Sequence, residues 1–364
     1  MNPAYALQQL GQSIWLDNIS RQILLDGTLQ HYIDDSAITG LTSNPTIFEK
    51  GISSSSLYDQ QIHQLGEVMK SAEQIFFELA LDDLRQAANL FAPRHKATNG
   101  VDGWVSLEVS PLHANSAAQT IHQAKQLHIS ANKKNLFIKI PGTPQGLIAI
   151  KESIFSDISI NVTLLFSREH YLAAADAYMS GLEARIEAGM EVNKVSSVAS
   201  IFVSRWDVAA DKSAPQEMHN QLGIAVAQQI YCAYRQMLIS PRWRKLAEAG
   251  AQHQRLLWAS TGTKDPAAPD TLYIQALAAP DTINTMPEKT LLAFSNHGFV
   301  NGSMPVDDGE ANKIIAAFLK IGIDDQLLAI QLQKQGVSAF SQSWAELMTV
   351  IRQKSASFSP TLAS

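Results

Sequence analysis

Lys139 is the residue whose setting most clearly invites chemistry. It interrupts residues 136–140, an otherwise apolar run that predicts a strand. A lysine is almost never fully buried without a partner, and burial favours a neutral amine over an ammonium. A neutral amine can attack a carbonyl carbon and form a Schiff base. The alternative is a lysine at a sheet edge whose ammonium reaches water.

Two carboxylates lie in similar settings. Glu108 belongs to residues 104–110 and Asp17 to residues 13–18, and both runs predict strands. Glu108 alone could be an ion-pair partner. Schiff-base chemistry needs several proton transfers, which two carboxyls in different surroundings could supply. The pair therefore fits the hypothesis that Lys139 suggests.

Other polar residues extend the candidate set. Asn44 precedes a proline and could be only a turn residue. Arg205 could form a surface ion pair with Asp207, or its planar guanidinium could clamp a phosphate group. The ten histidines follow no metal-binding spacing, so we expect no metal, and His297 is interpreted as an ordinary loop histidine.

The elements that must position these residues alternate in type. Eight short apolar or β-branched runs predict strands at 13–18, 38–43, 104–110, 136–140, 158–166, 194–203, 256–260 and 282–286. Helical periodicity marks residues 71–91, 117–127, 145–155, 168–188, 215–239, 265–276, 309–319 and 324–352. Eight alternating units predict an α/β fold, a (β/α)8 TIM barrel with additional C-terminal helices. An open doubly wound sheet is the rival, but it would normally carry a glycine-rich first turn, and the sequence has none.

Length and composition limit the functional classes. The chain has 364 residues, 46% hydrophobic and 17% charged, which suits a large core and excludes a disordered chain. The net charge of −6 disfavours a nucleic-acid binder. A single cysteine, Cys232, excludes an internal disulfide and a multi-cysteine metal site, and we expect it to be buried. We interpret residues 1–364 as one barrel domain on which the helices of about residues 309–354 pack.

The sequence also bears on location and assembly. It shows no basic segment followed by an apolar run at its start and no apolar stretch of about 18 residues. We therefore expect a cytoplasmic protein with no membrane partner. The oligomeric state is left open, and a homodimer is compatible with the sequence.

Four ordered motifs resemble those of one family. Residues 40–48 resemble an N-terminal signature of transaldolases, and residues 161–167 resemble another. Between them, residues 105–109 and 137–143 fall in the family's order. The resemblance extends over about residues 8–354 and is strongest to the longer bacterial transaldolases that lack a fused phosphoglucose-isomerase domain.

This resemblance implies a barrel that moves a dihydroxyacetone unit between sugar phosphates. Sedoheptulose 7-phosphate and glyceraldehyde 3-phosphate would exchange with erythrose 4-phosphate and fructose 6-phosphate, in the non-oxidative pentose phosphate pathway. The resemblance implies no cofactor and no metal. Two alternatives remain: a class I aldolase that releases free dihydroxyacetone, and a non-catalytic barrel that serves as a scaffold.

The motif match also implies roles for four residues. Lys139 would form the Schiff base with the ketose carbonyl. Asp17 would take the proton of the C4 hydroxyl as the C3–C4 bond breaks. Glu108 would act through a water held by Thr163 when the carbinolamine loses or regains water.

Substrate contacts follow from the same match. Asn44 and Asn161 would hold the hydroxyls of the dihydroxyacetone unit, assisted by Ser200. Arg205 and Ser260 would bind the phosphate. Shorter transaldolases carry a second phosphate-binding arginine two residues after this serine, but Gly262 occupies that position here. Lys264 is a candidate to supply the cation instead.

Overall fold

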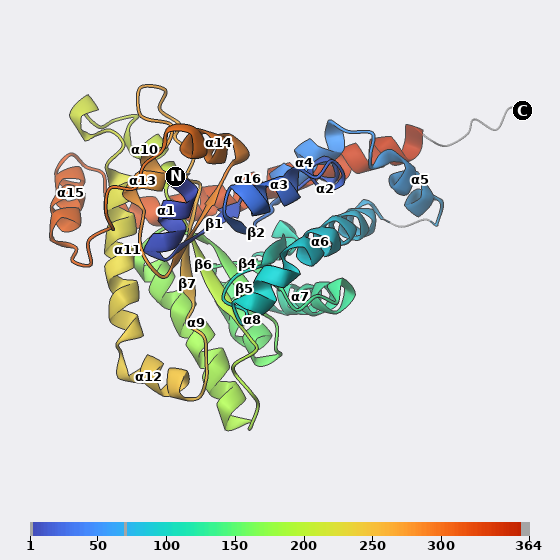
Figure 1. The fold of residues 1–364 in the computed structure, drawn as a ribbon, viewed down its shortest axis with the longest axis horizontal. Helices are drawn as coiled ribbons and strands as arrows, with labels where there is room; N and C mark the ends of the chain where they lie inside the picture. Colours follow the sequence, from blue (N-terminus) through green and yellow to red (C-terminus); the bar gives the residue numbers. More distant parts are fainter. Residues whose placement is uncertain (1–2, 69–70, 358–364) are drawn as a thin grey trace, which may run out of the picture.

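Eight parallel strands form the centre of the molecule (Figure 1). The computed structural model describes residues 3–68 and 71–357. The strands are β1 (Gln12–Leu16), β2 (Ile38–Leu41), β3 (Val105–Glu108), β4 (Leu136–Pro141), β5 (Ile160–Leu165), β6 (Ser197–Phe202), β7 (Arg255–Ala259) and β8 (Thr282–Met286). Their order in the sheet is β2-β1-β8-β7-β6-β5-β4-β3. Each predicted strand is present, and the predicted TIM barrel is confirmed.

The barrel closes between β2 and β3. Gly40 forms an isolated parallel bridge with Trp104, and the Leu41 amide donates a 2.9 Å hydrogen bond to the Trp104 carbonyl. A Cβ atom at position 40 would lie 2.7 Å from that carbonyl oxygen and 2.7 Å from the Trp15 ring. Only glycine allows the two strands to approach this closely.

Helices surround the barrel and connect its strands. The first half of the chain contributes α1 (Pro3–Leu10), α2 (Arg21–Leu25), α3 (Thr28–Asp35), α4 (Pro45–Ser53), α5 (Asp59–Glu67), α6 (Ala72–Ala97), η1 (Pro111–His113), α7 (Ala117–Ala131), α8 (Pro144–Phe155) and α9 (Arg168–Glu187). The second half contributes α10 (Ser204–Ala210), η2 (Gln216–Met218), α11 (Leu222–Leu238), α12 (Pro241–Glu248), α13 (Leu272–Ala276), α14 (Glu288–His297), α15 (Gly309–Lys320) and α16 (Asp325–Ser357).

Two of the predicted helices are shorter than expected. The helix expected at residues 215–239 forms only over Leu222–Leu238, and the one expected at 265–276 only over Leu272–Ala276. Pro215, Pro266 and Pro269 precede these helices, which is consistent with their later start. The interpretation of His297 as a loop residue is wrong, because His297 ends α14 and lies 2.8 Å from an Asp270 carboxylate oxygen.

Cys232 is buried in α11, as expected from its apolar surroundings. Burial raises the pKa of the Cys232 thiol to about 11, so its reactive thiolate form is disfavoured. Among residues 3–68 and 71–357, no helix combines the length and apolar character needed to span a bilayer.

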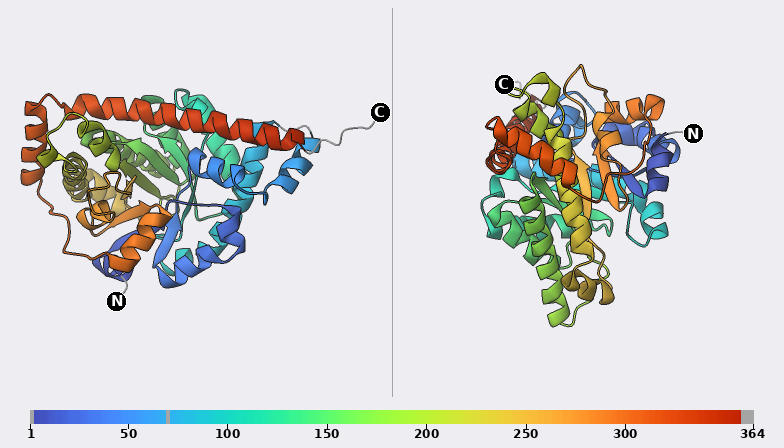
Figure 2. Two further views of the ribbon diagram at one scale, coloured as in Figure 1. Left: turned by 90° about the horizontal axis from the view of Figure 1, so that it is seen from above. Right: turned by 90° about the vertical axis from the view of Figure 1, so that its left-hand side faces the viewer.

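The last helix crosses the molecule. Figure 2 shows α16 as one long helix that runs from beside α15 across the full width of the fold. It packs against α4, α5 and α6, and it also contacts β5 and α10. The C-terminal helix therefore lies against elements that carry candidate site residues.

Candidate active site

A cavity of about 130 Å³ opens at the carboxyl ends of the barrel strands. Chemistry in this fold takes place at that end of the barrel. Eight of the ten candidate residues line the cavity, namely Asp17, Asn44, Lys139, Thr163, Ser200, Arg205, Ser260 and Lys264. The other two, Glu108 and Asn161, contact members of this set.

Lys139 lies in β4, between β3 and β5, and is only 4% exposed. The interpretation of Lys139 as an edge lysine that reaches water is therefore wrong. Its Nζ atom donates a 2.9 Å hydrogen bond to the Ser43 carbonyl and lies 3.2 Å from Glu108 Oε2. The amine is thus buried and held at the cavity wall by a carbonyl and a carboxylate.

Glu108 lies beside Lys139 because the two residues are register partners of β3 and β4. Burial raises the pKa of the Glu108 carboxyl, and the attraction of the Lys139 ammonium opposes this shift. Apart from the ion pair, Glu108 Oε2 has no hydrogen-bond partner among the described residues. Thr163 Oγ1 is also buried without a partner in that part of the chain.

Asp17 directly follows β1 and lines the cavity. Thr42 Oγ1 donates a 2.7 Å hydrogen bond to Asp17 Oδ1. Burial raises the pKa of the Asp17 carboxyl, while the Thr42 hydrogen bond and the charges of Lys139 and Lys264 act in the opposite direction. Two carboxyls with raised pKa therefore belong to the site, and their neighbours differ. Asp17 lines the cavity beside a hydroxyl, and Glu108 lies next to the cation of Lys139.

Asn44 has both of the roles considered for it. It is the N-cap of α4, where its Oδ1 accepts a 3.1 Å hydrogen bond from the Ile47 amide. It also lines the cavity, and its side-chain Nδ2 has no recorded partner among the described residues. The cap thus fixes the side chain and leaves an amide donor available to a ligand.

Asn161 and Ser200 form a buried polar pair on β5 and β6. Ser200 Oγ donates a 2.6 Å hydrogen bond to Asn161 Oδ1, and Asn161 Nδ2 donates a 3.2 Å hydrogen bond to Ser106 Oγ. Asn161 has no exposed surface, whereas Ser200 lines the cavity. In this arrangement Asn161 reaches the cavity through Ser200.

Arg205 lies in α10, at the mouth of the cavity. The centroid of the Phe202 ring lies 4.9 Å from its Cζ atom and that of the Phe340 ring 5.9 Å away. No described residue forms a hydrogen bond or an ion pair with its guanidinium. Burial lowers the pKa of Arg205 from its ordinary value, and the charge of Glu108 opposes this effect.

The surface ion pair considered for Arg205 is absent. Asp207 is buried and accepts hydrogen bonds from Tyr273 OH at 2.7 Å and from the Gly223 amide at 2.9 Å. Burial raises the pKa of Asp207 to about 6. Asp207 therefore ties α10 to α11 and α13 while Arg205 faces the cavity.

Ser260, Gly262 and Lys264 complete the polar wall. Ser260 shares a 2.9 Å hydrogen bond with Ser204 Oγ. A Cβ atom at Gly262 would lie 3.8 Å from Lys264 Nζ. The Lys264 ammonium therefore occupies the space next to position 262, and no described residue forms an ion pair with it.

Comparison with known proteins identifies the family. Residues 14–351 match the sequence model of the family described as Transaldolase/Fructose-6-phosphate aldolase. The chain belongs to this family. Similar proteins named Transaldolase occur in Frankia alni, with 42% identity over 97% of both chains, and in Arthrobacter sp. (strain FB24), with 43% identity over 95% of both chains. The protein of that name from Thermobifida fusca is 41% identical over 97% of this chain and 98% of its own length.

The match confirms the resemblance to transaldolases that the four motifs indicated. It spans every strand of the barrel except the first two residues of β1. The alignments cover 97% of this chain and 97–98% of the relatives from Frankia alni and Thermobifida fusca.

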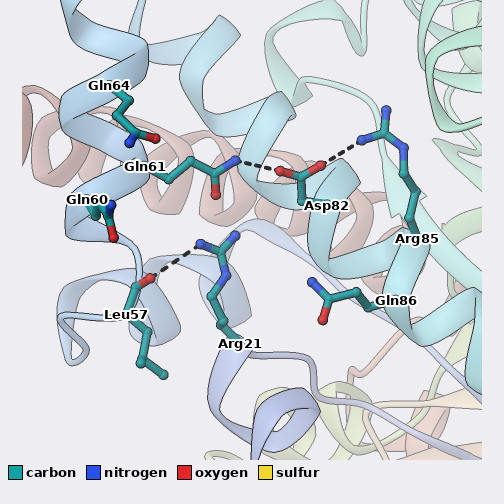
Figure 3. Close-up of a pocket in the computed structure, with 8 residues that line it drawn as sticks. All are labelled: Arg21, Leu57, Gln60, Gln61, Gln64, Asp82, Arg85 and Gln86. Carbon is teal, nitrogen blue, oxygen red and sulfur yellow. Dashed lines mark hydrogen bonds and ion pairs between the residues drawn. The ribbon is translucent and has the colours of Figure 1, made fainter.

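The structure has a second, larger pocket whose charged side chains already form ion pairs. It has a volume of about 640 Å³ and is lined by residues of α2, α5 and α6 and by Leu57 (Figure 3). Its two arginines are already paired, Arg21 with Asp83 at 2.9 Å and Arg85 with Asp82 at 2.7 Å. Its charges are neutralised and none of the candidate residues lines it, so this pocket is not a candidate active site.

Three further residues at the site received no role from sequence reasoning. Thr42 binds Asp17, while Phe202 and Phe340 flank Arg205. Thr42 lies in the family signature, and Phe202 ends β6, so both were within reach of the argument from strand ends. Phe340 belongs to α16, where its apolar character gave no signal beyond helical packing.

Proposed function

We propose that this protein is a transaldolase that carries a dihydroxyacetone unit on Lys139 between sugar phosphates. The observation that carries the proposal is the buried Lys139 amine, 3.2 Å from Glu108 in a cavity that also holds Asp17 and the unpaired Arg205. Family membership and relatives named Transaldolase support it.

The chemistry begins at the ketose carbonyl. Neutral Lys139 Nζ attacks C2 of fructose 6-phosphate and gives a carbinolamine, which loses water to form the protonated imine. Asp17 then takes the proton of the C4 hydroxyl as the C3–C4 bond breaks. The bonding electrons move into the imine, which becomes a neutral enamine, and glyceraldehyde 3-phosphate has no further bond to the enzyme. The reverse steps join the enamine to a new aldehyde.

The dehydration step requires a water and a carboxyl. Glu108 Oε2 and Thr163 Oγ1 are both buried, and each lacks a hydrogen-bond partner in the described part of the chain. Buried polar atoms of this kind are commonly satisfied by an ordered water. We propose that a water bound by Thr163 Oγ1 passes protons between Glu108 and the carbinolamine. Asn44 and the Asn161–Ser200 pair would hold the hydroxyls of the three-carbon unit.

Arg205, Ser260 and Lys264 suit the phosphate group at the other end of the substrate. Arg205 provides a planar donor fork, and Lys264 provides a point charge beside position 262, where shorter family members carry arginine. The proposed substrates are therefore sugar phosphates.

We expect Arg205→Ala to reduce kcat/KM for fructose 6-phosphate. The reduction should correspond to about 2–4 kcal/mol of lost transition-state stabilisation, the range for removing one partner of a desolvated charge pair. Lys264→Met should cost less, about 0.2–1 kcal/mol, because Lys264 is exposed. Unphosphorylated fructose should lose far less with either variant. Steady-state kinetics on both sugars checks this, and equal losses on both would give Arg205 a structural role.

We propose that residues 1–364 form one domain and that the enzyme works in the cytoplasm without a cofactor. A homodimer is compatible with the sequence. Eight of the ten residues that the steps above use line the cavity, and Glu108 and Asn161 contact members of that set.

A second candidate function is an aldolase that releases free dihydroxyacetone, since the family's description includes fructose-6-phosphate aldolase. Incubation with fructose 6-phosphate, with and without erythrose 4-phosphate, separates the two. A transaldolase should form sedoheptulose 7-phosphate when this aldehyde is present and little free dihydroxyacetone when it is absent. Rapid release of dihydroxyacetone without an acceptor would establish the aldolase instead.

A further inference from the structure

Phe340 connects the C-terminal helix to the reacting centre. It is 6% exposed and lines the cavity from α16. The centroid of its ring lies 6.0 Å from Lys139 Nζ and 5.9 Å from Arg205 Cζ. One aromatic ring therefore faces both the amine that would carry the three-carbon unit and the cation that would bind the phosphate.

The helix that carries Phe340 is fastened to the strands that carry the site. Gln333 Nε2 lies 3.1 Å from the carbonyl oxygens of Gly142 and Leu164, which belong to the ends of β4 and β5. Farther along the helix, Ser343 Oγ shares a 2.8 Å hydrogen bond with Thr46 Oγ1 of α4. These contacts hold α16 on both sides of Phe340.

Between Gln333 and Phe340, α16 also lies close to the barrel. A Cβ atom at Gly336 would lie 2.8 Å from Leu164 Cδ2 and 3.3 Å from an Arg205 guanidinium nitrogen. Position 336 is one helical turn before Phe340. The absence of a side chain at Gly336 lets the helix descend until the ring reaches the cavity.

We propose that Phe340 determines specificity by shielding the Lys139-bound enamine from water, so that transfer is favoured over hydrolysis. This inference rests on the proposed function. Hydrolysis needs one proton at the nucleophilic enamine carbon and then one water at the imine carbon. It breaks the bond to Lys139 and yields dihydroxyacetone and the free amine. Release of the product ketose needs the same water attack, so protonation of the enamine carbon is the step that separates hydrolysis from transfer. An apolar ring near the amine offers no proton donor to that carbon and keeps bulk water from supplying one.

The test compares two rates in each variant. One is dihydroxyacetone release from fructose 6-phosphate alone, and the other is sedoheptulose 7-phosphate formation from fructose 6-phosphate and erythrose 4-phosphate. Phe340→Ala should raise the ratio of release to transfer by about tenfold or more. Phe340→Leu keeps an apolar side chain at this position, and its ratio of release to transfer should stay closer to that of the wild-type enzyme. Gln342→Ala, an exposed change two residues along α16, should leave the ratio unchanged.

A purely structural role for Phe340 would lower both rates together and leave their ratio unchanged, which would overturn the proposal. Phe340→Val replaces the alanine variant if that variant does not fold, and the same ratio decides. Failure of the proposed function is visible separately, because wild-type enzyme would then show no sedoheptulose 7-phosphate before any variant is made.

Discussion

Lys139→Arg should abolish covalent trapping of fructose 6-phosphate by borohydride and lower transfer by about 10⁴-fold or more, equivalent to ~5.4 kcal/mol. The guanidinium stays protonated and cannot attack the ketose carbonyl. In the wild-type enzyme, borohydride should add a reduced dihydroxyacetone unit to the peptide that contains Lys139. Intact-protein mass and peptide mapping together give the extent and the site of labelling.

Two further variants serve as controls for this experiment. Lys139 is buried beside Glu108, so a larger cation there could disturb the fold. Lys139→Met avoids a second buried cation and should also fail to form the adduct. Lys134→Arg changes an exposed lysine outside the cavity and should be labelled like wild type. Label on any other lysine would remove Lys139 from the mechanism.

Much of the fold was predictable because the barrel strands repeat one pattern. Each of the eight strands is a short apolar or β-branched run, and both faces of the strands are buried. Several helices were not predicted, among them α2 with five residues and α10, which begins two residues after β6 ends. Helices this short carry too few turns for a 3.6-residue period to stand out.

The site residues likewise differ in whether the sequence could predict them. Lys139 and Glu108 were predictable because a charge inside an apolar strand is costly unless a partner or a reaction requires it. Phe340 was not, since an apolar residue at helical spacing fits any core position equally well. Its place at the cavity follows only from how α16 crosses the barrel, a tertiary contact that no local pattern encodes.

Asp17→Ala and Glu108→Ala should stop the reaction at different steps. If Asp17 takes the C4 proton, the Asp17 variant still forms the imine but cannot break the C3–C4 bond. Borohydride should then trap an intact six-carbon adduct, phosphate included, on Lys139. If Glu108 serves dehydration, its loss should slow imine formation, and any adduct that forms should still cleave to the three-carbon species. Turnover should fall by about 10²–10⁴-fold in both variants.

The two carboxyls have different neighbours, so their variants can be compared independently. Asp17 is held by Thr42 and Glu108 by Lys139, so each side chain can be changed without removing the other's partner. Asp17→Asn and Glu108→Gln keep the side-chain volume and should give the same two adduct masses as the alanine variants. If Glu108 serves only dehydration, its loss leaves the cleavage step intact. Slower trapping in the Glu108 variants would therefore point to the water step. If the Asp17 variants give only the three-carbon adduct at normal speed, cleavage does not depend on Asp17, and the two roles must be exchanged while Lys139 keeps its own.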